Sequence, residues 1–146
     1  MFDFSYYTPT RVVFGRDTED RTGELVKQYG GSRVLLHYGG HSALCSGLID
    51  RIKVSLDAAG LYHVELGGVV PNPHLSKVRE GIALAKEHGV DFLLAVGGGS
   101  VIDSAKAIAY ALAEPEHDVW ELFAHTRQAK ACLPVGAVLT IAASGS

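Results

Sequence analysis

The sharpest chemical signal in the sequence is the run Gly97-Gly98-Gly99-Ser100, which directly follows the apolar stretch 93–96. Such an apolar stretch predicts a strand buried on both faces, and the periodic residues after Ser100 predict a helix. Glycines at this junction let another group approach the backbone closely and permit positive φ. Because unpaired N–H groups at a helix start attract phosphate, we predict an anion site here rather than a merely flexible turn.

The spacing within this loop excludes two familiar phosphate motifs. The loop lacks the G-x-G-x-x-G pattern, and it follows the third predicted strand of an alternating series rather than the first. It also lacks the Gly-Lys-Ser/Thr of a P-loop. Ser100 and Asp103 have the spacing of a capping box, which predicts Ser100 as the N-cap of the following helix.

Two other predicted strand ends carry residues that suit an anion. Gly39-Gly40-His41-Ser42 follows the first strand of the series, where the alternative is a plain glycine turn with Ser42 as N-cap. The last predicted strand ends at Thr140 and runs into a segment that contains Ser144. Because ligands bind beyond the carboxyl ends of parallel strands, three such ends predict a site for an extended ligand such as a dinucleotide.

These strand ends belong to a regular alternation of strands and helices, which predicts βαβ units with right-handed crossovers. We therefore predict an α/β fold, a Rossmann-like parallel sheet with flanking helices, in one domain over residues 1–146. Strands are expected over 34–38, 62–66, 91–96 and 134–140, and helices over 18–29, 44–59, 73–88, 101–113 and 120–123.

Three further expectations concern the connections and the ends of the chain. Aromatic and β-branched residues flank Thr8-Pro9-Thr10 between residues 4 and 14, which predicts an N-terminal β-hairpin. Asn72 is predicted as an N-cap, with Pro73 as the first residue of the helix. Because a strand that leads into Ser144-Gly145-Ser146 usually continues into a helix, we expect a truncated chain.

The composition is that of a soluble globular domain, with 146 residues, of which 47% are hydrophobic and 20% charged. A net charge of −3 without clustered Lys or Arg gives no electrostatic footprint for nucleic acid or an anionic membrane. The sequence has no signal-peptide pattern and no apolar run of about 18 residues, so we expect a cytoplasmic protein. Cys45 and Cys132 fit no metal or redox spacing, and idle thiols are favoured over a disulfide.

The histidines and the exposed aromatic residues carry less information. Seven histidines are scattered without an H-x-x-x-H pair on a predicted helix, so we predict surface or capping roles for most and no metal site. Trp120 and Phe123 are expected to make a core or interdomain contact rather than a ligand-stacking patch.

In combination these motifs resemble those of the iron-containing (group III) alcohol dehydrogenases, particularly the butanol dehydrogenase-like branch that reduces aldehydes. The resemblance covers essentially the whole chain. The matching segments are residues 6–15, 67–73, 97–106 and 140–146.

The resemblance implies a two-domain enzyme whose amino-terminal α/β domain binds NAD(P). A helical carboxy-terminal domain, expected to be missing here, would hold a divalent metal (Fe or Zn) with one Asp and three His. That metal would polarise the oxygen of a primary alcohol or aldehyde during hydride transfer. We therefore expect no catalytic residue in this chain, no activity of the chain alone, and a homodimer.

The resemblance also implies roles for the predicted site residues. Pyrophosphate contacts are expected from Gly97, Gly98, Gly99 and Ser100, and Asp103 would lie near the nicotinamide, although capping alone could explain it. Thr140 and Ser144 would lie near the adenosine or ribose groups.

The choice of cofactor depends on the turn Gly39-Gly40-His41-Ser42, which contains no acid to accept from a ribose 2′-hydroxyl. The N–H groups of Gly40 and His41, with the Ser42 hydroxyl, offer donors for a 2′-phosphate instead. NADP is therefore expected, with NAD as the second choice.

Two other function classes stay open. One is a metal-dependent lyase of the dehydroquinate synthase type, which shares the related fold and cofactor, and the other is a stand-alone nucleotide-binding module. The loop Pro71-Asn72-Pro73 favours the dehydrogenase over the lyase.

Overall fold

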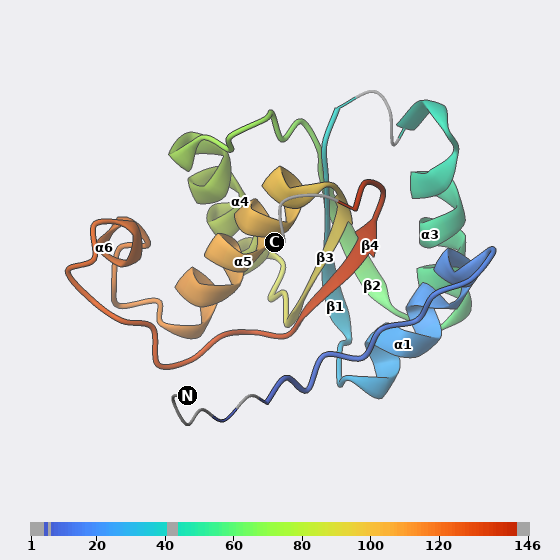
Figure 1. The fold of residues 1–146 in the computed structure, drawn as a ribbon, viewed down its shortest axis with the longest axis horizontal. Helices are drawn as coiled ribbons and strands as arrows, with labels where there is room; N and C mark the ends of the chain where they lie inside the picture. Colours follow the sequence, from blue (N-terminus) through green and yellow to red (C-terminus); the bar gives the residue numbers. More distant parts are fainter. Residues whose placement is uncertain (1–4, 6, 41–43, 143–146) are drawn as a thin grey trace, which may run out of the picture.

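The computed structural model describes residues 5, 7–40 and 44–142. Its centre is a sheet of four parallel strands in the order β2-β1-β3-β4, with α1 and α3 on one face and α4 and α5 on the other (Figure 1). The elements are η1 (Thr18–Arg21), α1 (Thr22–Gln28), β1 (Arg33–Tyr38), α3 (Leu48–Ala58), β2 (Tyr62–Leu66), α4 (Leu75–Glu87), β3 (Phe92–Gly97), α5 (Gly99–Ala113), α6 (Trp120–Phe123) and β4 (Val135–Leu139). None of the helices in the described ranges has both the length and the hydropathy of a membrane span.

The two inner strands carry the core because each of their faces is covered by helices. Along β1, Val34 and Leu36 pack with α1 and α3, whereas Leu35 packs with α4 and α5. Every residue of β3 is buried. This is the burial expected of a parallel sheet with helices on both faces, and it explains the apolar runs at 34–36 in β1 and along β3.

The chain leaves β1 and β3 on opposite faces of the sheet. After β1 it continues into α3, which packs with α1, and after β3 it continues into α5, which packs with α4. The two strands are direct neighbours, with Tyr38 paired to Val96 in register. Their carboxyl ends therefore diverge at a topological switch point, the place where open α/β sheets bind ligands.

The predicted N-terminal hairpin is wrong for the residues that the structure describes. Residues 5 and 7–14 form no strand, and Tyr7, Val12 and Phe14 remain 85%, 82% and 99% exposed. Isolated hairpins are marginal in water unless an apolar face packs on something else. Within the described residues, the apolar side chains of this segment have no such surface to pack against.

Helices α3, α4 and α5 begin at residues other than those predicted, and α3 does so at Leu48 rather than at residue 44. Helix α4 begins at Leu75 with His74 as its extended N-cap, whereas Asn72 has a left-handed φ of 55° rather than the extended backbone typical of an N-cap. Helix α5 begins at Gly99 with Gly98 as its N-cap, and no side chain caps it. Ser100 therefore lies inside the first turn, and the predicted capping box with Asp103 is wrong.

His37 is a core residue, unlike the surface role expected for most histidines, and it joins three elements. Its Nδ1 lies 2.8 Å from the Leu66 carbonyl oxygen of β2, and its Nε2 lies 2.8 Å from Ser104 Oγ of α5. A carbonyl only accepts, so Nδ1 carries the proton and Nε2 accepts from the serine hydroxyl. Burial lowers the pKa of this imidazole, which keeps the neutral tautomer that satisfies both bonds.

This lowered pKa predicts a pH-dependent stability. Below about pH 6.5 the unfolded chain protonates His37 while the folded chain does not, so the free energy of unfolding should fall as the pH drops from 6.5 to 5.5. The contribution of one histidine is at most about 1.4 kcal/mol per pH unit. Urea unfolding across this range should show a shallower slope for His37→Gln than for the wild type. The exposed control His125→Gln should keep the wild-type slope, and equal slopes for all three proteins would contradict the assignment.

Candidate functional site

Three of the predicted site segments meet at the carboxyl edge of the sheet. The Thr140 N–H donates to the Gly97 carbonyl oxygen at 3.1 Å, which joins the ends of β3 and β4. A Cβ added to Gly39, at the end of β1, would lie 3.6 Å from Cγ2 of Val101 in α5. The glycine turns after β1 and β3 and the end of β4 therefore form one continuous edge. The predicted contributions of His41, Ser42 and Ser144 lie outside the described residues.

Gly97 is required by the fold itself. Its φ is 155°, and an added Cβ would lie 2.6 Å from Val101 Cγ2, which is too close for any side chain. This glycine lets the chain turn from β3 directly into α5 while the first turn of the helix packs against the strand.

Gly98, in contrast, is not required by the fold. Its φ is −92°, which any residue adopts, and among the described residues no atom lies within 4 Å of a Cβ added there. Within the same described residues, a Cβ added to Gly40, which follows β1, also meets no atom within 4 Å. The backbone at both turns is therefore accessible at close range, which is what a bound phosphate needs.

The start of α5 supplies hydrogen-bond donors to this space. The first hydrogen bonds of the helix are donated by Val101 and Ile102 to the Gly98 carbonyl oxygen. The N–H groups of Gly99 and Ser100 come before these bonds, and the helix itself provides no acceptor for them. The helix continues for 15 residues and has no acidic side chain in its first turn. Its positive dipole end is therefore not neutralised locally, and it favours an anion.

The loop from Gly67 to Asn72, which we call the β2–α4 loop, also belongs to this edge, although the sequence reasoning left it out of the site. Gly68 N–H donates to the Gly39 carbonyl oxygen at 3.0 Å, and Asn72 N–H donates to Ser100 Oγ at 3.3 Å. The loop thus touches both glycine turns. The signal that could have revealed it is Gly67-Gly68, a third glycine pair directly after a predicted strand.

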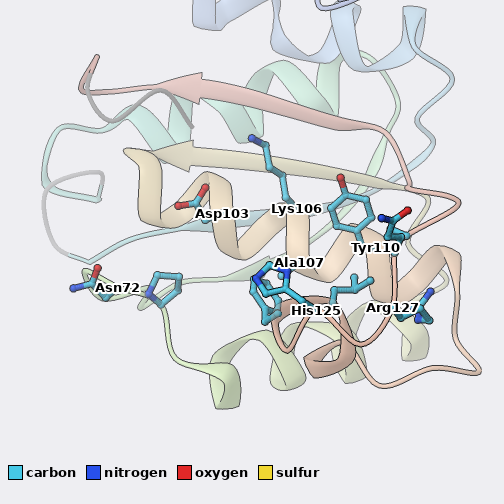
Figure 2. A pocket seen from close by; sticks show the side chains of 12 residues that line it. Asn72, Asp103, Lys106, Ala107, Tyr110, His125 and Arg127 are labelled. Atoms are coloured by element: carbon cyan, nitrogen blue, oxygen red, sulfur yellow. The ribbon is translucent and has the colours of Figure 1, made fainter.

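Asp103 faces a groove beside the glycine edge (Figure 2). The groove has a volume of about 890 Å³, and α5 lines it with Asp103, Lys106 and Tyr110. Asn72 closes one end, and α6 with the following loop forms the opposite wall. Asp103 is exposed on the helix, so the structure places a carboxylate close to the glycine turn 97–99 without a capping role.

A buried carboxylate holds the far wall of this groove. Glu114 accepts from the Lys130 N–H at 2.6 Å and the Ala131 N–H at 3.1 Å, and it pairs with the Arg127 guanidinium. The bond from Arg127 lowers the pKa of Glu114. The loop after α6 is therefore fixed to the end of α5 by charge-assisted bonds.

The remaining candidate residues do not join the site. Trp120 and Phe123 stack on each other with ring centroids 6.4 Å apart and stay 54% and 53% exposed, so they are not core residues of this chain. Cys45 and Cys132 are both free and exposed. Among the described residues, no three His, Cys, Asp or Glu side chains come together in a way that could hold a metal ion.

Comparison with known proteins identifies the family. The family model described as iron-containing alcohol dehydrogenase matches residues 9–146. The chain belongs to the iron-containing alcohol dehydrogenase family. This confirms the resemblance inferred from the glycine loops, although each loop alone would have been a weak signal.

Relatives within the iron-containing alcohol dehydrogenase family are similar over the whole chain. The "Probable NADH-dependent butanol dehydrogenase 1" of Bacillus subtilis is 50% identical over 146 residues, which are 100% of this chain and 37% of that protein. The NADPH-dependent aldehyde reductase YqhD of Escherichia coli is 40% identical, again over 100% of this chain and 37% of that protein. The chain thus spans little more than a third of the length of these relatives.

A solved structure in the same family confirms the α/β architecture. The NADH-dependent butanol dehydrogenase A of Thermotoga maritima superposes with a TM-score of 0.93 at 46% identity. The match covers 98% of this chain and 36% of that one.

The family name implies iron, but the described residues of this chain do not fit it. They contain no cluster of three candidate ligands, and the iron and zinc sites of enzymes typically use at least that many converging side chains. We therefore derive no chemical step in this chain through a metal.

The contrast between the two glycines of the turn predicts different stabilities for matched variants. Gly97→Ala should lower the free energy of unfolding by about 2 kcal/mol, because its Cβ overlaps Val101 at a positive φ. Gly98→Ala should cost less than about 1 kcal/mol, the loss of a glycine N-cap in open space. Urea unfolding of both variants tests this, and equal losses would contradict the described path of the turn.

Proposed function

We propose that residues 1–146 form the NAD(P)-binding domain of an oxidoreductase that transfers hydride between a nicotinamide dinucleotide and an alcohol or aldehyde. The observation that carries this proposal is the open backbone at Gly98 and Gly40, on two strand ends that diverge at the switch point. A single phosphate would need only one such end, whereas a dinucleotide is long enough to use several.

Each part of the edge suits a different part of the cofactor. The N–H groups of Gly99 and Ser100, with the Ser100 hydroxyl, would hold the pyrophosphate over Gly97 and Gly98. Gly39 and Gly40, with His41 and Ser42, would take the 2′ side of the adenosine ribose, and Thr140 and Ser144 would lie near the adenosine or ribose groups. Asp103 would lie near the nicotinamide, beside the groove. When bound, the nicotinamide ring supplies the hydride chemistry.

The activity is proposed for a longer protein of which this chain is one part. Relatives that carry the activity in their names are nearly three times as long as the matched region, and no three candidate metal ligands cluster among the described residues. We therefore expect this chain to bind cofactor without turning it over. The cytoplasmic location and the homodimer belong to the same proposal.

The residues of this chain and the name of the relative with 50% identity point to different cofactors. The turn after β1 has no acid to repel a 2′-phosphate, which favours NADPH. The relative with 50% identity is named as NADH-dependent, and the one with 40% as NADPH-dependent. Our proposal keeps NADPH as the first choice because it follows from this chain's own residues.

A fluorescence titration of the chain with NADPH and with NADH tests the proposal. Gly98→Val should weaken binding at least about tenfold, because its side chain would fill the space reserved for the pyrophosphate and displace a charge-assisted contact. The control is Ala83→Val, which places the same valine side chain on the exposed face of α4.

Circular dichroism of each variant separates unfolding from loss of binding. A folded wild-type chain that binds neither nucleotide at millimolar concentration would refute the proposed function. Equal binding by the wild type and a folded Gly98→Val would refute the assignment of the phosphate to this loop. Tighter binding of NADH than NADPH would overturn only the cofactor preference.

A further inference from the structure

The hydrogen bond between Asn72 and Ser100 suggests a specific role for the end of the β2–α4 loop. The argument for that role rests on the proposed cofactor site. Asn72 lies 28 positions before Ser100, and its backbone N–H donates to Ser100 Oγ at 3.3 Å. No other hydrogen bond of this hydroxyl occurs among the described residues.

The loop is fixed at its first half and so holds Asn72 in place. Gly68 N–H bonds the Gly39 carbonyl oxygen at 3.0 Å, and Val69 N–H bonds the Tyr38 carbonyl oxygen at 3.3 Å. Val69 is 7% exposed and packs in the same core cluster as Val101 in the first turn of α5. The first half of the loop is therefore held to the end of β1 by two backbone hydrogen bonds. Val69 also holds it in the core cluster that contains the first turn of α5.

The direction of the bond determines what the serine can do. A hydroxyl has one proton to donate and two lone pairs that accept. Because Asn72 N–H occupies an accepting position of Ser100 Oγ, the serine proton stays available for another acceptor. In the proposed site that acceptor is a phosphate oxygen, which binds hydroxyl donors through strong charge-assisted bonds.

We propose that Asn72 is a positioning residue for the cofactor, and that its backbone N–H orients the Ser100 hydroxyl to donate to the pyrophosphate. The left-handed conformation of Asn72, with φ at 55°, presents its N–H to Ser100. Asparagine and glycine adopt this conformation most readily, whereas β-branched residues resist it. The identity of residue 72 thus acts through the backbone rather than through its exposed side chain.

Four variants with measured NADPH and NADH affinities test this proposal. Ser100→Ala should weaken binding about tenfold or more, the value of one hydrogen bond to a charged group. Asn72→Val should weaken it about fivefold, because valine disfavours positive φ. Asn72→Gly should stay within about twofold of the wild type, because glycine keeps the conformation and the N–H. Ser76→Ala, on the exposed start of α4, is the control for loss of a serine hydroxyl.

A double-mutant cycle shows whether Asn72 acts through Ser100. In the Ser100→Ala background, adding Asn72→Val should cause no further loss of affinity, because the group that it orients is already absent. Asn72→Ala serves as the milder variant if Asn72→Val perturbs the circular dichroism spectrum.

The outcomes distinguish this proposal from the proposed function. Binding by the wild type but not by Gly98→Val would support the proposed cofactor site. Unchanged binding by Asn72→Val would then overturn only the positioning role of Asn72. Additive losses in the cycle would overturn it too, as would a loss in Asn72→Gly equal to that in Asn72→Val, which would assign the effect to the side chain. A wild type that binds neither nucleotide would overturn both proposals.

Discussion

The parallel pairing of β1 with β3 is the interaction on which the rest of the structure depends. These strands lie side by side in register from Val34 and Phe92 to Tyr38 and Val96, yet the chain leaves them toward opposite faces of the sheet. The helices that follow cannot both cover the carboxyl edge, so the backbone of the two turns stays open there. The open edge that we propose as the cofactor site is thus a consequence of topology.

The core beneath this edge keeps the turns in place. His37 at the end of β1 bonds both the last residue of β2 and the second turn of α5. A buried imidazole with both nitrogens paired avoids the cost of an unsatisfied polar group. The bond to Ser104 links α5 directly to β1, and the N–H groups proposed to hold the pyrophosphate lie at the first turn of the same helix. The packing of α5 therefore positions the proposed site.

Most of the fold could be predicted from the sequence, because buried parallel strands and amphipathic helices leave plain patterns of apolar residues. All four strands were predicted to within two residues at either end. The N-caps predicted at Asn72 and Ser100 were wrong, because His74 and Gly98 occupy those positions. The N–H of Asn72 instead bonds the Ser100 hydroxyl 28 positions away, whereas capping rules consider only local spacing. The prediction of an N-terminal hairpin was wrong, because alternating apolar residues form a stable hairpin only where their apolar face packs against another surface.

The candidate site was predictable in part for the same reason. Glycine turns at strand ends are visible in sequence, and the structure brings Gly39, Gly97 and Thr140 together. The difference between Gly97, which the fold requires, and Gly98, which it does not, depends on where Val101 packs. Only the structure shows that difference, and it makes Gly98 the glycine whose substitution tests the proposed binding with least effect on the fold.

The most direct test of the binding edge is a titration of the ¹⁵N-labelled chain with NADPH and NADH, followed by amide proton and nitrogen chemical shifts. The signals of Gly39, Gly98, Gly99, Ser100 and Thr140 are expected to shift together, in proportion to cofactor bound. Signals from the opposite edge of the sheet, such as Ser32 and Tyr62, should stay in place. Shifts at that opposite edge, or shifts confined to α6 and the loop after it, would contradict a dinucleotide site at the switch point.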